Sequence, residues 1–210
     1  MPIAKMTTSR APIPIPILIM AVLSGLVALG TYRFLLLGLP MSFQEMIGHI
    51  DQRRVASLLH ISVAPVALVL GSLQLFPRLR ARKPALHRWV GRVYGGSILI
   101  AGGAGLVVAP GAAGGIVVSL GFGLLAVLWL GITANAVRLA VIGRIAQHRR
   151  WMYRSFALTF SAVTLRLYLL GFMAAGFSYT EASIYLAWIC WVPNLLFAEW
   201  FVRRFPRVAS

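Results

Sequence analysis

Two of the four histidines stand in similar basic segments and could together hold a metal-containing cofactor. The two segments are His87-Arg88-Trp89 and His148-Arg149-Arg150-Trp151, and each of them opens a long apolar run. A b-type haem is held by two neutral imidazoles, which neighbouring helices present at one depth of the membrane. If both segments lie at the same membrane face, His87 and His148 could supply this pair of metal ligands.

Residues near these two histidines could contact such a cofactor. Gly91 follows His87 by four residues, so it lies on the same helix face and leaves room for a flat porphyrin. The guanidinium groups of Arg88, Arg92, Arg149 and Arg150 could pair with haem propionates. A simpler interpretation stays open, in which His and Arg at a membrane boundary only form a basic collar that binds lipid headgroups.

A second candidate site lies deeper in the apolar runs. His60 is predicted as a further metal ligand, well inside its span. Arg166 follows His148 by eighteen residues, about 27 Å along a helix, which brings it to the depth of His60. An intramembrane arginine needs a partner. We expect an anionic ligand group, a haem propionate, or a carboxylate of Glu45 or Asp51, and a structural Arg–carboxylate clamp is the alternative.

Several enzyme classes leave no signature in this sequence. It has no glycine-rich phosphate loop, no His-Glu-x-x-His and no nucleophile elbow, which argues against an ATPase or a hydrolase. No acidic residue falls midway along an apolar run, which argues against a proton-driven transporter. Cys190 is the only cysteine, so no disulfide framework is expected. A membrane redox protein is the enzyme-like function that remains.

Composition indicates a membrane protein. Of the 210 residues, 60% are hydrophobic and 11% are charged, and the apolar residues fall in long unbroken runs. The net charge of +16 would suggest nucleic-acid binding in a soluble protein. Here the basic residues are spread between the apolar runs, as the positive-inside rule describes, so no nucleic-acid partner is expected. The expected surroundings are a lipid bilayer.

We predict an all-α fold, a polytopic transmembrane helical bundle whose helices position the candidate residues. The bundle forms a single domain over residues 1–210. Six spans are expected, at about 13–37, 55–76, 86–109, 115–140, 151–175 and 184–201. The first run resembles a signal peptide in outline, but it is long enough to cross ~30 Å of hydrocarbon. The polar stretch 40–54 could form a short interfacial helix.

The basic residues predict the orientation of this bundle. Sixteen of them lie in segments that alternate with barely charged loops, three lie on the other side and Arg166 lies within a span. The positive-inside rule then places both termini in the cytoplasm, with His87 and His148 near the inner face. We expect a multi-pass protein of the bacterial inner (cytoplasmic) membrane.

Two segments carry a resemblance to a known family. The segments 86–94 and 148–166, which contain both histidine motifs and Arg166, resemble a bacterial family of membrane proteins catalogued as domain of unknown function 2306. The resemblance covers roughly residues 60–170, and it implies a membrane fold without an activity.

A looser likeness is to cytochrome b561-type haem-binding helical bundles, in which histidines on alternate helices ligate haem near each face. His87 and His148 match half of this pattern. The other half fails, because His60 would need a histidine on the fourth span, which has none.

Three functions follow from these observations. The first is a membrane-embedded protein that carries electrons through haem b, with a membrane protein or a quinone as its redox partner. The second is a cofactor-free accessory or structural subunit of a larger membrane complex. The third is a transporter for a small anionic or neutral solute.

Overall fold

The computed structural model describes residues 14–37 and 47–204, although not the side chains of Ile47 and His49. In these residues every regular element is a helix, and no strand occurs. The helices are α1 (Ile15–Leu37), α2 (Ile47–Gln52), α3 (Arg54–Gln74), α4 (Pro77–Arg82), α5 (Pro84–Val108), α6 (Ile116–Val141), α7 (Ile145–Thr159), α8 (Ser161–Ala174), α9 (Tyr179–Ile189) and α10 (Val192–Arg203).

Six helical segments of the described chain are long and apolar enough to cross a membrane, which confirms the predicted six-span bundle. Four of them are the single helices α1, α3, α5 and α6. The fifth, Ile145–Ala174, joins α7 to α8, and the sixth, Tyr179–Arg203, joins α9 to α10. The orientation of the bundle in the membrane stays a prediction.

The fifth and sixth spans begin earlier than the sequence indicates. The fifth begins at Ile145 rather than near Trp151, because the basic residues before Trp151 continue the helix. The sixth begins at Tyr179, where the Ser178 side chain accepts a hydrogen bond from the Glu181 backbone and Glu181 returns one to Ser178. Such a capping box stabilises a helix start, so Glu181 lies in the helix and not in a loop.

Both of these spans are interrupted once. A turn at Phe160 separates α7 from α8. Cys190 and Trp191 separate α9 from α10, and Pro193 occupies the first turn of α10, where its missing N–H costs no helical hydrogen bond. Each interruption redirects the second half of its span.

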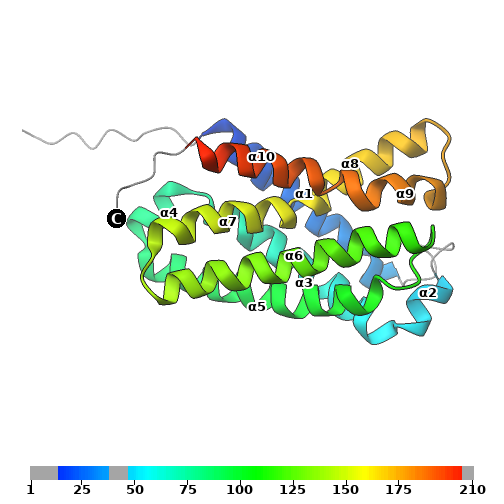
Figure 1. The fold of residues 1–210 in the computed structure, drawn as a ribbon, viewed down its shortest axis with the longest axis horizontal. Helices are drawn as coiled ribbons and strands as arrows, with labels where there is room; N and C mark the ends of the chain where they lie inside the picture. The colour runs from blue at the N-terminus through cyan, green and yellow to red at the C-terminus, as the bar shows by residue number, and fades with distance from the viewer. Residues whose placement is uncertain (1–13, 38–46, 205–210) are drawn as a thin grey trace, which may run out of the picture.

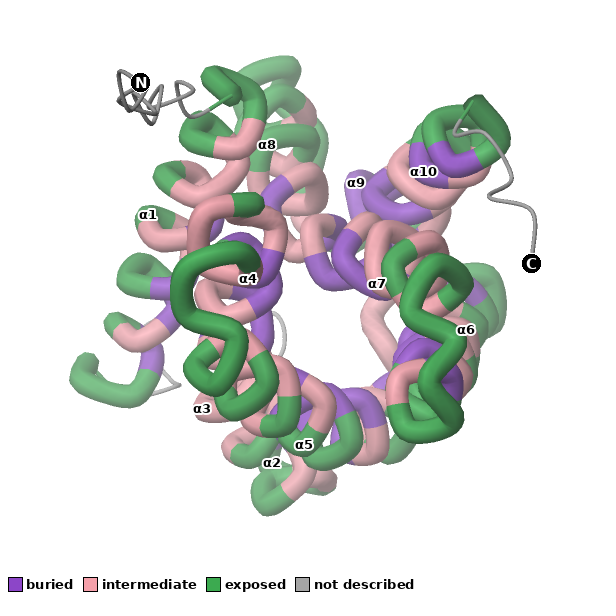
Figure 2. Tube along the Cα trace, turned by 90° about the vertical axis from the view of Figure 1, so that its left-hand side faces the viewer, coloured by how far each residue is buried: buried purple, intermediate pink, exposed green. Residues whose placement is uncertain are grey.

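The spans run side by side along the long axis of the molecule (Figure 1). Viewed from the end where α4 lies, α3, α5, α6 and α7 surround a common axis, and α1 and α10 lie at the periphery (Figure 2). In this four-helix unit α3 packs on α5, and α6 packs on both α5 and α7. Helices α5 and α7 therefore lie diagonally opposite each other. The two ends of the bundle are called the α4 end and the α2 end below.

The distribution of exposed and buried side chains is that of a helical bundle surrounded by lipid. Large apolar residues remain exposed on the outside, among them Leu29, Leu99 and Val141, whereas many buried positions are small. Helices approach most closely at glycine, as expected where packing rather than the hydrophobic effect holds helices together. A Cβ at Gly121 on α6 would lie 2.7 Å from the carbonyl oxygen of Ala187 on α9.

Candidate functional site

Helices α5 and α7 are in register across the diagonal of the four-helix unit. The hydroxyl of Tyr94 on α5 lies 2.8 Å from the hydroxyl of Ser155 on α7. His87 precedes Tyr94 by seven residues, and His148 precedes Ser155 by the same number. Seven residues are about two helical turns and return to nearly the same face. Both imidazoles therefore belong to the two faces that meet at Tyr94 and Ser155, at a common level nearer the α4 end.

A cavity of about 490 Å³ occupies this level. Residues of α3, α4, α5, α6 and α7 line it, and His87 and His148 are both among them. Its size falls in the range of small-molecule and cofactor sites, about 300–1,000 Å³. The two histidines predicted to share a site thus line one cavity, and their role as metal ligands stays a prediction.

The imidazole of His148 is fixed from one side. Its Nδ1 lies 2.8 Å from the carbonyl oxygen of Ala136 on α6. Since a carbonyl only accepts, Nδ1 carries the proton and donates it, which leaves Nε2 unprotonated in the neutral ring. This is how metal-ligating histidines are commonly held in proteins.

His87 is held by its backbone and not by its ring. Gln74 Nε2 on α3 donates a hydrogen bond of 3.0 Å to the His87 carbonyl. In contrast, the His87 Nδ1 is buried and has no hydrogen-bond partner in the described chain. Gly91 lies one turn further along α5, where a Cβ would meet only the Gln74 side chain, at 3.7 Å. The backbone of α5 is thus open to the cavity beside His87.

The rim of the cavity is strongly basic. Its lining includes the predicted residues Arg88, Arg92 and Arg149, together with Arg80 of α4, and among the described residues it includes no aspartate or glutamate. The predicted Arg150 does not line the cavity and donates instead to the Val202 carbonyl. Arg88, Arg92 and Arg149 are exposed, so they stand at the mouth and not at the bottom. A ligand with an anionic end and an apolar body matches this distribution.

Tyr94, which lines the cavity, belongs to a buried polar network. The Tyr94 hydroxyl bonds to Thr159 at 2.8 Å as well as to Ser155, and Ser155 also bonds to Thr133 at 2.7 Å. Trp129 Nε1 donates to Thr159 Oγ1 at 2.9 Å, while the Thr159 hydroxyl donates to the Ser155 carbonyl.

The donors in this network can be assigned from Thr159. Because the Thr159 hydroxyl donates to the Ser155 carbonyl, it can only accept from Tyr94. Tyr94 therefore donates to Thr159, Ser155 donates to Tyr94, and Thr133 donates to Ser155. All these donors and acceptors are then satisfied without a ligand. Hence the network closes the floor and holds the Tyr94 ring in place.

Sequence reasoning missed several cavity residues. Tyr94 crosses to α7 because α3 carries glycine at position 71, where a Cβ would lie 2.7 Å from the Tyr94 ring and 3.0 Å from Phe156. Gln74 and Arg80 also line the cavity. The sequence held one signal for each of them. Gln74 is a polar residue within an apolar run, and Arg80 belongs to the basic segment between the second and third expected spans.

His60 and Arg166 are placed elsewhere. His60 Nδ1 donates to the Ala101 carbonyl of α5 at 2.8 Å, and its ring packs against Gly105. Neither residue lines the cavity that holds His87 and His148, nor a second hollow of about 630 Å³ at the α2 end, which Asp51 and Arg53 line. In the described chain no hydrogen bond joins His60 to Arg166, and a metal at His60 stays a prediction.

Arg166 is bonded to neutral oxygens. Its guanidinium donates to the Ala162 carbonyl and to the Thr31 hydroxyl of α1, both at 2.8 Å. Of the carboxylates suggested for it, Asp51 is exposed on α2 and Glu45 lies outside the described residues. Arg166 thus ties α1 to α8, and a role for it in cofactor binding stays a prediction.

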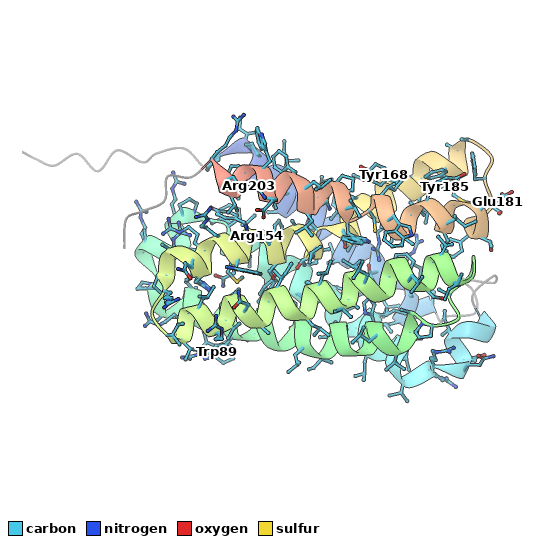
Figure 3. The ribbon with its side chains drawn as sticks, viewed as in Figure 1. Trp89, Arg154, Tyr168, Glu181, Tyr185 and Arg203 are labelled. Carbon is cyan, nitrogen blue, oxygen red and sulfur yellow. The ribbon has the colours of Figure 1, made fainter. Side chains whose placement is uncertain are left out.

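A salt bridge braces the outside of the bundle beside the cavity. Glu199 on α10 accepts from Arg154 on α7 at 2.6 Å and from Arg203 at 3.0 Å. Arg154 and Arg203 lie on neighbouring helices, and Trp89 points outward from α5 (Figure 3). None of these four residues lines the cavity.

Comparison with known proteins gives a family and no function. No curated protein and no solved structure matches the chain, so the likeness to cytochrome b561-type bundles stays a prediction. The model of the family described as predicted membrane protein (DUF2306) matches residues 57–202. This match contains α5, α7 and every residue that lines the cavity of His87 and His148, whereas α1 lies outside it. The chain therefore belongs to the DUF2306 family of predicted membrane proteins.

Proposed function

We propose that this multi-pass protein is a b-type haem carrier of electrons in the bacterial cytoplasmic membrane, with His87 and His148 as the axial ligands. The observation that supports this proposal most is that both imidazoles line one cavity from diagonally opposite helices of a four-helix unit. Two imidazoles supplied from opposite helices to one cavity are the donor set that a six-coordinate haem requires. Among the described residues no group of three or more His, Cys, Asp or Glu side chains gathers, so a bis-imidazole site is the metal chemistry that this region offers.

The charges around the cavity fit the same cofactor. Arg88, Arg92 and Arg149 stand at the mouth with no carboxylate among the lining residues, so they would hold the two propionates. Met152 and Phe156 supply apolar wall, which excludes water from the ring. Bound haem would supply reversible one-electron chemistry, and the protein would supply ligation, orientation and a dry surround.

The position of the cavity suggests the redox partners. The cavity lies near the α4 end of the bundle, which the basic residues predict to be cytoplasmic. A quinone in the inner leaflet or a membrane protein docked there would reach the cofactor over the shortest path.

The decisive experiment is a visible spectrum of the detergent-purified protein from haem-sufficient cells. We expect a Soret band and sharp α and β bands on reduction by dithionite. Arg80→Gln, at the cavity, should lower haem occupancy, whereas Arg82→Gln, on the same short helix but outside the cavity, should not. A colourless wild-type preparation to which added haemin does not bind would contradict the proposal.

The mouth of the cavity, which arginines line without any aspartate or glutamate among the lining residues, also supports a second candidate. This candidate is the binding of a lipid that carries phosphate or carboxylate. The saturated Tyr94 network closes the floor, which favours a binding site over a transport path for such a molecule. Native mass spectrometry of the haem-free protein would test it. An anionic lipid that stays bound to the wild type and is lost from Arg92→Gln would favour this candidate over haem.

A further inference from the structure

The two histidines of the cavity are held to different degrees, and this difference bears on what the site can do. The His148 ring is oriented by the Ala136 carbonyl at 2.8 Å, which fixes its tautomer and directs Nε2 away from α6. A second contact of this kind raises the basicity of a ligating imidazole and keeps its ring from rotating. His148 is therefore prepared for metal binding before any cofactor arrives.

The His87 ring lacks such a contact. Within residues 14–37 and 47–204 its buried Nδ1 has no hydrogen-bond partner, and the bond from Gln74 fixes only the backbone carbonyl of His87. If Nε2 faced the metal, the buried Nδ1–H would have no acceptor; if Nδ1 faced it, no group would orient the ring. In both arrangements His87 would hold a metal less firmly than His148 would.

We infer that His148 anchors the cofactor and that His87 is the exchangeable ligand, so that the site accepts a small neutral Lewis base such as carbon monoxide in place of His87. This inference rests on the proposed haem function and extends it from electron transfer to ligand binding. In the exchange the imidazole of His87 takes back its lone pair and the incoming molecule donates one. No electron is gained or lost, and no further reactant is needed.

The surroundings allow the exchange. Gly91 leaves the α5 backbone beside His87 without a side chain, and the nearest atom to a Cβ there is 3.7 Å away. On the opposite wall Met152 follows His148 by four residues and lines the cavity. Of the two lining residues that lie one turn beyond the histidines, Gly91 beside His87 has no side chain and Met152 beside His148 has a long one, so the wall beside His87 is the less filled of the two.

The test compares His87→Ala with His148→Ala in the detergent-purified, haem-loaded protein. Haem per protein is measured as the pyridine haemochrome, and reduced spectra are recorded with and without carbon monoxide. We expect His87→Ala to keep most of its haem, to become high-spin and to bind carbon monoxide at least tenfold faster than the wild type. His148→Ala should lose haem at least tenfold.

Controls separate folding from ligation. Imidazole in the buffer should restore haem binding to a His148→Gly variant, which would show that the cavity of this variant is intact. The His87→Ala and His148→Ala variants should both elute as the wild type does in size exclusion. Equal loss of haem from both alanine variants, or greater loss from His87→Ala, would overturn the inference while leaving the haem function standing. A wild-type protein that binds no haem would remove the proposed function itself.

Discussion

The hydroxyl of Tyr94 on α5 meets the hydroxyl of Ser155 on α7 at 2.8 Å, across the diagonal of the four-helix unit. Together with the bond from Tyr94 to Thr159 on the same helix, this contact fixes the relative depth of the two helices that carry His87 and His148. It also closes the floor of the cavity, because the Tyr94 ring lines it from below.

Tyr94→Phe removes the hydroxyl on which this register depends. The Ser155 donor and the Thr159 acceptor then lose a partner in a buried region, and we expect a loss of stability of about 1–2 kcal/mol. Thermal unfolding in detergent measures it. Tyr168→Phe, on an exposed part of α8, serves as the control and should leave the midpoint unchanged. Equal midpoints for both variants would show that the network does not hold the helices.

The sequence predicts the parts of this fold that depend on hydropathy and charge. Six apolar runs give six spans, and the shared positions of His87 and His148 at the starts of two spans predict that they meet. A cationic partner for Glu199 is predictable as well, because an acid in an apolar segment needs a cation at its own depth. By depth Arg138 and Arg154 are the two candidates, and the structure shows Arg154.

Other features depend on packing that no local pattern reveals. Tyr94 looks like any aromatic residue of an apolar run, and only the space above Gly71 on another helix lets it reach α7. The separate helix α4, which brings Arg80 to the cavity, reads as a basic loop. The interruption at Phe160 carries no proline or glycine to mark it.

Gly121→Ala should separate two helices. The new Cβ would lie 2.7 Å from the Ala187 carbonyl oxygen, and a backbone atom cannot rotate away as a side chain can. Overpacking of this kind costs about 1–3 kcal/mol. Gly131→Ala is the matched control on the same helix, since nothing lies within 4 Å of its Cβ, and it should be neutral or slightly stabilising. The unfolding midpoints of the two variants in one detergent decide the matter.

Glu199→Gln should destabilise the packing of α10 on α7. The Arg154 side chain is 16% exposed and would lose its anion, whereas that of Arg203 is 75% exposed and remains solvated. We expect a loss of about 1–2 kcal/mol for Glu199→Gln and under about 0.5 kcal/mol for Arg203→Gln. Equal effects in thermal unfolding would mean that the exposed pair matters as much as the half-buried one.

Cysteine labelling tests the orientation of the bundle. Cys190 is buried, so the wild-type chain should not react with a membrane-impermeant maleimide and provides a silent background. Ala81→Cys on α4 and Pro110→Cys at the other end are exposed positions. In intact spheroplasts we expect only Pro110→Cys to react, and after lysis both. Labelling of Ala81→Cys before lysis would reverse the orientation and move the histidine cavity to the outer face.

Gly71→Ala tests whether the cavity floor sets the depth of the ligand site. The added Cβ would lie 2.7 Å from the Tyr94 ring and 3.0 Å from Phe156, and both of these rings line the cavity. Since the hydroxyl of Tyr94 is held by Ser155 and Thr159, its ring must tilt about that end. We therefore expect haem occupancy to fall by severalfold while the helical circular dichroism stays at the wild-type level. Gly95→Ala, whose Cβ would meet Val137 at an ordinary 3.5 Å, should keep both quantities unchanged. Full occupancy in Gly71→Ala would place the ligand nearer the arginine rim than the floor.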